Sequence, residues 1–191
     1  MKSFRSFIFS LNEDSPSPYV GNWEKEGLNR DQIGHFRHGA EEFQYFKNDY
    51  TKIHDNENHE FYISNGLHSK KRYMGDIIRV NKKTQDVNGV LKIGVPYTHD
   101  DDDYYIDYST ATEPHFYKEV IPLITEKLGK NLISDFKQSQ YAENAWKAEI
   151  KRGRTAYVYS KSGIDKNQPI HSENVNNVSW SEIPRVVFPR K

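Results

Sequence analysis

Short stretches of alternating or continuous apolar residues dominate the first 110 positions, and such stretches are typical of strands. Residues 4–11 (FRSFIFSL) alternate imperfectly, and four later stretches follow at 60–66, 73–83, 89–97 and 104–109. Because these stretches lie close together in the chain, we expect them to pair as an antiparallel meander. Between the stretches 73–83 and 89–97, Asn88-Gly89 favours positive φ, which predicts a hairpin turn there.

One helix is predicted in the difficult region between the first two strands. Residues 40–50 repeat apolar positions at helical spacing. Its apolar face consists of Phe43, Phe46 and Tyr50. Gly34 and Gly39 favour a helix that begins after them, because glycine weakens helix interiors.

A change from strand to helix spacing follows residue 110. The apolar residues that recur at helical spacing are Phe116, Val120, Ile124 and Leu128. Thr112 can cap the first turn, and Pro114 suits a position inside it. Pro122 lacks the backbone N–H that a helix interior uses, so it should kink or split this helix.

The last third of the chain predicts a second helix over 134–151, which Gly153 can end. Residues 154–160 (RTAYVYS) form a short strand pattern, and 161–177 look like a loop. Residues 183–189 (IPRVVFP) predict a last short strand at a sheet edge, because prolines bracket it. The chain is therefore expected to be one α+β domain over 1–191. Its mostly antiparallel sheet comes from the N-terminal two-thirds, followed by two C-terminal helices and a short final edge strand.

Composition refines this picture without naming a function. Hydrophobic residues make up 35% of the chain, but 13 Tyr and 10 Phe can still build a core. The 27 basic and 27 acidic residues cancel, and there is no cysteine for disulfides or thiolate metal sites. Apolar runs are too short for a signal peptide or a membrane span, so we expect a cytoplasmic protein. Its abundant Lys, Asn, Asp, Ile and Tyr are typical of an AT-rich genome, such as a low-GC bacterium or its phage.

The acidic run 99–103 (HDDDD) raises the question of a metal site. Adjacent aspartates diverge and lack the spacing of a calcium loop, so we interpret the run as a solvated turn. His35 and His38 lie three apart, but no glutamate follows in the order that zinc proteases use. We therefore expect no metal centre and no resident cofactor.

Three separated motifs resemble a known enzyme family. Arg72 in KRYMG, Ser109-Thr110 in DYSTATE and Glu149 in KAEIKRGRTAYVY follow one another at intervals of 37 and 40 residues. This order and spacing resemble the arginine–serine–glutamate class of ADP-ribosyltransferases. The resemblance implies that Arg72 grips the phosphates of NAD, that the strand carrying Ser109 orders the pocket, and that Glu149 stabilises the oxocarbenium ion. The sequence departs from that family at Lys147, where the family has Glu or Gln.

Glu149-Ile150-Lys151 also has the spelling of a nuclease motif, in which carboxylates bind magnesium and a lysine orients water. That motif needs a strand, whereas this segment is predicted to be helical. The spelling alone therefore leaves a magnesium-dependent nuclease as a further alternative.

Positive charge gathers in one part of this neutral chain. The stretch 147–166 holds six basic residues against two acidic ones, and tyrosines lie among the bases. Bases and aromatics together suit phosphate pairing and stacking of a nucleotide. The candidate ligand-binding residues are Lys151, Arg152, Arg154, Tyr157 and Tyr159.

The leading hypothesis is a cytoplasmic binding protein that recognises a protein partner or a nucleotide-like ligand. The alternatives are an NAD-dependent ADP-ribosyltransferase-like enzyme, with Arg72, Ser109 and Glu149 as candidate catalytic residues, and a magnesium-dependent nuclease. We expect no membrane association. We also expect no strong nonspecific DNA binding, because that needs an excess of positive charge.

Overall fold

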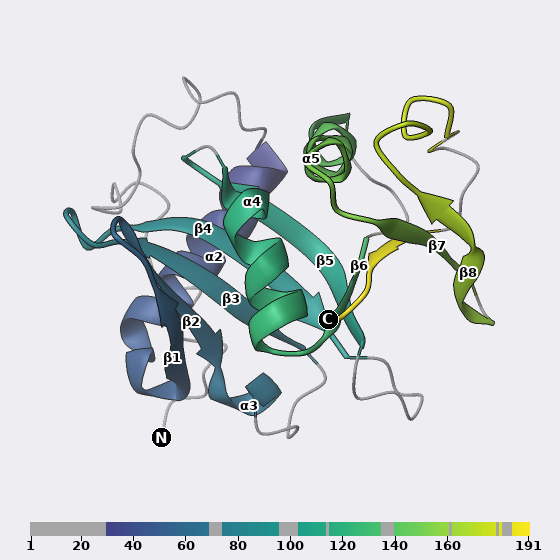
Figure 1. Cartoon of the computed structure of the whole chain (residues 1–191). Coiled ribbons are helices and arrows are strands. Elements are labelled where there is room, and N and C mark those ends of the chain that lie inside the picture. The colour runs from purple at the N-terminus through teal and green to yellow at the C-terminus, as the bar shows by residue number, and fades with distance from the viewer. Residues whose placement is uncertain are drawn as a thin grey trace.

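A computed structural model describes residues 30–68, 74–95, 103–113, 115–134, 140–160, 162–178, 180 and 185–191 (Figure 1). The strands are β1 (Tyr50–Asp55), β2 (His59–Ser64), β3 (Met74–Asn81), β4 (Val87–Gly94), β5 (Asp103–Ala111), β6 (Asn131–Ile133), β7 (Ala156–Ser160), β8 (Gly163–Ile170) and β9 (Val186–Phe188). The helices are α2 (Arg30–Tyr45), the 3-10 turn η2 (Lys47–Asp49), α3 (Asn65–His68), α4 (Phe116–Pro122), the π-helix η3 (Leu123–Lys127) and α5 (Gln140–Lys151). Within these ranges no helix combines the length and the apolar character that a membrane crossing demands.

The nine strands found in the described residues form one sheet in the order β1-β2-β3-β4-β5-β6-β9-β7-β8. Neighbouring strands run antiparallel except β5 and β6, which are parallel. The predicted α+β class with a mostly antiparallel sheet is therefore confirmed. The predicted distribution of elements is wrong, because α2 precedes every described strand and the sheet continues through β7, β8 and β9 to the C-terminal residues.

Two apolar cores lie on opposite faces of the sheet. Ile77 and Leu91 belong to the larger core, whereas their chain neighbours Ile78 and Val90 belong to the smaller one. Figure 1 shows α4 over one face and α2 behind the other. Successive side chains of a strand point to opposite faces, so β3 and β4 are buried on both sides. Each strand therefore has two consecutive buried apolar residues at its centre, Ile77-Ile78 in β3 and Val90-Leu91 in β4, rather than an alternating pattern.

Helix α2 corrects the prediction of a helix over 40–50. The helix already begins at Arg30, contains both glycines and ends before Tyr50, which opens β1. A Cβ atom on Gly39 would lie 2.6 Å from Val90 Cγ1. Gly39 therefore allows α2 to approach β4 closely, and tertiary packing offsets its low helix propensity.

The hairpin between β3 and β4 also differs from the prediction. Asn88 and Gly89 lie inside β4, and the positive φ of 63° belongs to Gln85. A Cβ atom on Gly89 would lie 2.6 Å from the Phe116 ring. This glycine therefore makes room for α4 on the sheet instead of forming the turn.

The C-terminal strands are rearranged relative to the sequence prediction. The predicted edge strand is wrong, because β9 lies between β6 and β7 and pairs with both. No proline lies within β9 itself, so Val187 and Phe188 keep their backbone N–H groups, while the Val186 N–H donates to the Ser134 hydroxyl at 3.0 Å. The predicted loop 161–177 instead contains β8, which lies at one edge of the described sheet, with β1 at the other. The polar composition of β8 suits an edge that faces water.

Helix α4 and η3 carry the chain from β5 to its parallel neighbour β6. The N-cap is His115, with φ of 66°, rather than the predicted Thr112. The predicted effect of Pro122 is confirmed, because the α-helix ends there and a π-helix follows. Leu128 N–H donates to the Leu123 carbonyl at 3.1 Å, which is the wider spacing of that helix type.

A buried ionic network fastens α4 to the sheet. Arg79 of β3 is fully buried, and its Nη1 donates to Glu119 Oε2 of α4 at 2.7 Å. The two ring nitrogens of His59 contact Glu119 Oε1 at 3.0 Å and Glu113 Oε2 at 3.1 Å. We call these four residues the Arg79 network. It satisfies a charge that would otherwise be very costly to bury.

The acidic run is only partly within the described residues. Arg72 and residues 99–102 lie outside them, as does the predicted first strand over 4–11. Asp103 is 4% exposed, so for this residue the expectation of a solvated turn is wrong. Its carboxylate accepts hydrogen bonds from Asn131 Nδ2 at 2.7 Å and from Tyr159 Oη at 3.0 Å. These partners come from β6 and β7, which a sequence pattern does not reveal.

Candidate functional site

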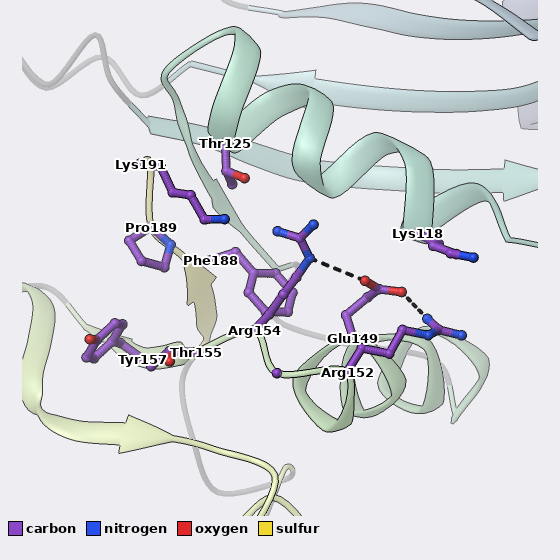
Figure 2. A pocket seen from close by; sticks show the side chains of 11 residues that line it. Lys118, Thr125, Glu149, Arg152, Arg154, Thr155, Tyr157, Phe188, Pro189 and Lys191 are labelled. Carbon is purple, nitrogen blue, oxygen red and sulfur yellow. Dashed lines mark hydrogen bonds and ion pairs between the residues drawn. The ribbon is translucent and has the colours of Figure 1, made fainter. Parts of the chain in front are cut away.

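A pocket of about 510 Å³ lies where the end of α5 and the turn after it face α4 and η3 (Figure 2). Small-molecule pockets are typically about 300–1,000 Å³, so this one can take a ligand of that class. Tyr157 of β7, Phe188 of β9 and the residues that follow β9 complete its wall. Its charged lining side chains are Lys118, Arg152, Arg154, Lys191 and the acidic Glu149.

The turn that ends α5 places the two arginines. Gly153 has φ of 96° and donates its N–H to the Ile150 carbonyl at 2.9 Å. Arg154 N–H reaches back to the Glu149 carbonyl at 3.3 Å. This pair of hydrogen bonds is a Schellman motif, in which a glycine reverses the chain direction. The sequence prediction that Gly153 ends this helix is confirmed.

Because the chain reverses at Gly153, Arg152 and Arg154 flank the Glu149 side chain. Arg152 Nη1 contacts Glu149 Oε1, and Arg154 Nε lies 3.4 Å from Glu149 Oε2. The Glu149 side chain is only 3% exposed. A carboxylate near the C-terminal end of a helix is unfavourable in the field of the helix dipole, and the two guanidinium groups offset that cost. Figure 2 shows both contacts as dashed lines.

The opposite side of the pocket carries a second ion-pair group. Arg154 Nη1 lies 3.1 Å from Glu126 Oε1, and Lys191 Nζ lies 2.8 Å from the same oxygen. Hydrogen bonds from Lys191 and Arg154 hold the pKa of Glu126 below its ordinary value. Lys118 is exposed and forms no ion pair with any residue that the structure describes. Basic groups therefore outnumber acidic ones around the cavity.

Two aromatic side chains line the pocket, one buried and one partly exposed. Phe188 is 2% exposed and stacks on Trp146 of α5, with ring centroids 4.6 Å apart. Tyr157 of β7 also lines the pocket and is only partly buried. A partly exposed ring beside basic groups can stack on a planar ligand.

The structure brings together several of the residues that the sequence singled out. Glu149, Arg152, Arg154 and Tyr157 all line the pocket, whereas Lys151 is exposed and does not. The sequence signal for these four was their proximity along the chain.

Tyr159 also lies away from this lining. Its hydroxyl donates to Asp103 and contacts the hydroxyl of Tyr105. Burial, reinforced by those two hydrogen bonds, raises the pKa of Tyr159 above its ordinary value. Its polar group is therefore engaged inside the sheet instead of at the pocket.

Sequence reasoning missed the residues that come from distant segments. Lys118, Thr125 and Lys191 reach the pocket through α4, η3 and the chain after β9. Lys118 was visible only as a polar position in an amphipathic helix. No local pattern connects it with Arg152, because the two elements meet only in the folded chain.

The residues of the transferase resemblance are only partly described. Ser109 lies in β5, where its hydroxyl contacts the hydroxyl of Tyr117, and it does not line the pocket that contains Glu149. Arg72 lies outside the described residues, so the joint arrangement of the three stays a prediction. Glu149 lies on helix α5, as the helical pattern over 134–151 predicts.

The segment Glu149-Ile150-Lys151, which matches the nuclease motif in sequence, also lies in helix α5. Residues two apart on a helix do not share a face, and here Glu149 is buried while Lys151 is exposed. Among the residues that the structure describes, no group of three or more His, Asp or Glu side chains is arranged to hold a metal ion.

Comparisons with protein-family models, with curated proteins and with solved structures find no match to this chain. Any account of its function therefore starts from the geometry of the pocket.

Proposed function

We propose that this protein binds a nucleotide-like ligand in the pocket at the end of α5. The observation that carries the proposal is the lining itself, with four basic side chains, one acidic side chain and an accessible tyrosine in one cavity. Phosphate groups are recognised by such clusters of Arg and Lys. Tyr157 supplies a surface on which a base can stack.

The state of Glu149 favours binding over ADP-ribosyl transfer. Both of its carboxylate oxygens face arginines, and its side chain is buried. A glutamate that stabilises an oxocarbenium ion must present a carboxylate to the sugar. In this arrangement the arginines hold that carboxylate, and the basic groups of the pocket attract an anion instead.

Adenosine monophosphate (AMP) and adenosine test the proposal by isothermal titration calorimetry. AMP should give saturable binding, and adenosine should bind at least tenfold more weakly because it lacks the phosphate. A hydrogen bond to a charged group contributes about 1.5–3 kcal/mol, and about 1.4 kcal/mol is a factor of ten. Lys118→Ala and Arg152→Ala should therefore each raise the dissociation constant for AMP by about tenfold.

Lys151→Ala is the matched control for Arg152→Ala. Lys151 is the preceding residue, it is exposed, and it does not line the pocket. Its removal takes away the same formal charge and should leave AMP affinity nearly unchanged. An equal loss in both variants would indicate a diffuse electrostatic effect, and the absence of any nucleotide binding at millimolar concentration would contradict the proposal.

The role of Tyr157 separates a nucleotide from a simple phosphate. Stacking of a base on an aromatic side chain contributes about 1–3 kcal/mol. Tyr157→Ala should therefore weaken AMP binding by roughly tenfold and leave the binding of inorganic phosphate unchanged. Equal weakening of both ligands would restrict the site to the phosphate group.

A further inference from the structure

A row of polar side chains crosses the sheet beneath α2, on the face opposite α4. Tyr50 of β1 is paired with Ser64 of β2, and Asp76 of β3 is paired with Lys92 of β4, which is paired in turn with Tyr108 of β5. The Asp76 N–H donates to Ser64 Oγ at 3.2 Å, so the row is continuous across five strands. Tyr50 and Tyr108 are part of the smaller core or pack against it, and α2 covers that core. The row therefore lies at the interface between α2 and the sheet.

We propose that Asp76 makes the docking of α2 on the sheet sensitive to pH, so that α2 is held tightly in acid solution and loosens as the pH rises. This device is separate from the nucleotide pocket, whose lining contains no residue of α2 or of the row.

Asp76 is poorly compensated for a buried carboxylate. The residue is 3% exposed, and its Oδ1 accepts no hydrogen bond from any residue that the structure describes. Lys92 Nζ lies 3.7 Å from that oxygen, which is an ion pair but is too long for a hydrogen bond. The buried hydroxyl of Tyr50 likewise has no hydrogen-bond partner in the described part of the chain. A carboxylate in such surroundings is costly when it is charged and much less costly when it carries a proton.

The charged groups around Asp76 do not remove this cost. Glu42 of α2 adds a second negative charge, and His38 of α2 lies 3.7 Å from Glu42. Lys92 is the cation opposite Asp76, and its ammonium also lies 5.9 Å from the ring centroid of Tyr108. Burial raises the pKa of Asp76 above the ordinary 3.8, Lys92 and His38 lower it by less, and Glu42 adds to the rise.

The two tyrosines of the row add no charge to the interface. Burial, followed by the negative charge of Asp76, raises the pKa of Tyr50 and that of Tyr108 above their ordinary values. Both hydroxyls therefore keep their protons, and Tyr108 Oη donates to the His35 carbonyl of α2 at 3.3 Å. Ser64, the member of the row on β2, does not titrate. Asp76 is thus the group of the row whose charge changes in acid solution.

The direction of the pH effect follows from the two states of the interface. When α2 leaves the sheet, Asp76 meets water and its pKa returns toward 3.8. The docked state therefore binds the proton more readily than the undocked state. Docking is strongest below pH 3.8 and weakens as the pH rises through the raised pKa of the docked state. Each pKa unit between the two states is about a tenfold change in the docking equilibrium.

Native-state hydrogen exchange by NMR tests the proposal in the wild type and in Asp76→Asn, which keeps the shape of the side chain but cannot ionise. The two proteins are compared at the same pH, so that titration of groups elsewhere in the chain cancels. For amides of α2, the protection factor in Asp76→Asn divided by that in the wild type should rise at least about threefold from about pH 4 to about pH 8. A constant ratio overturns the proposal, and so does an equal rise for amides of α2 and α4, because the effect would then belong to the whole fold.

Asp107→Asn is the matched control, since Asp107 is an exposed carboxylate next to Tyr108 in β5. It makes the same chemical change outside the interface, so its ratio to the wild type should stay constant over the same pH range. Lys92→Gln removes the cation opposite Asp76 and should steepen the pH effect. The double variant Asp76→Asn/Lys92→Gln, compared with Lys92→Gln alone, should therefore show a larger rise than Asp76→Asn compared with the wild type. A rise that is no larger, or one that Asp107→Asn reproduces, shows that Asp76 is not the group responsible.

Discussion

The two glycines of α2 differ in the space around them, so the same substitution should have opposite effects on stability at the two positions. A Cβ atom on Gly39 would lie 2.6 Å from Val90 Cγ1, whereas one on Gly34 would meet nothing within 4 Å. Gly39→Ala should lower the free energy of unfolding by about 1–3 kcal/mol, because the added methyl group overpacks the contact with β4.

Gly34→Ala is the control in the same helix. Alanine is favoured over glycine in an open helical position, so this change should raise the free energy of unfolding by about 0.5–1 kcal/mol. Urea denaturation of both variants measures the two effects. Stabilisation by both substitutions would contradict the close packing of α2 on the sheet.

The candidate site shows how far single residues could be predicted. Arg152, Arg154 and Tyr157 lie within a few positions of one another, so their local charge and aromatic pattern already indicated a ligand site. The pairing of Glu149 with both arginines was not predictable, since it depends on the reversal of the chain at Gly153. Lys118 and Lys191 could not be assigned to the site, because only tertiary structure brings their elements to it.

At the scale of elements, α4 depends on the Arg79 network. Glu119→Gln keeps the shape of the side chain but removes the carboxylate that pairs with fully buried Arg79. Breaking such a pair should cost about 3 kcal/mol of unfolding free energy, the lower end for buried pairs, because the Glu119 side chain is 22% exposed. Glu41→Gln is the control, since the pair with Arg37 is on the helix surface and should change stability by less than about 0.5 kcal/mol.

The same substitution should remove part of the pH dependence of stability. Burial raises the pKa of Glu119, but hydrogen bonds from His59, Arg79 and Asn56 lower it by more, so the folded pKa lies below the ordinary 4.5. The unfolded state then binds the proton more readily, and the stabilisation present above about pH 4.5 is lost as pH falls through the folded pKa. The stability difference between wild type and Glu119→Gln should shrink over that acid range. A constant difference would show that the Glu119 charge is not what stabilises α4.

The elements that the sequence predicted best are those with a local apolar pattern. Strands β2 to β5 follow from such patterns, and β9 lies within the strand expected over 183–189, although its place inside the sheet was not predicted. The short β6 was not predicted, because three residues are too few for a periodic signal. Strand β8 looked like a loop because an edge strand that faces water needs no apolar face. The predicted helix begins too late because the local propensity of Gly39 disfavours a helix. The glycine is instead needed for the close contact of α2 with Val90 of β4, which the local sequence does not show.

At the scale of the whole molecule, charge is balanced overall but not around the pocket. The chain has 27 basic and 27 acidic residues, whereas the lining has four basic and one acidic. The neutral total gives no long-range attraction for a polyanion such as DNA. The local excess suits a small anion that fits within the cavity. The fold creates this local excess of basic side chains by bringing α4, η3 and the C-terminal residues together around the turn at Gly153.

The most direct test of this account is an NMR titration of the isotopically labelled protein with AMP. Backbone amide shifts of Gly153, Arg154 and Thr155 should move saturably, with the dissociation constant found by calorimetry, because these residues line the pocket. The double variant Lys118→Ala/Arg152→Ala should lose these shifts at the same AMP concentrations. Shifts that cluster on another face of the molecule, or no shifts at millimolar AMP, would contradict the claim that this pocket binds a nucleotide-like ligand.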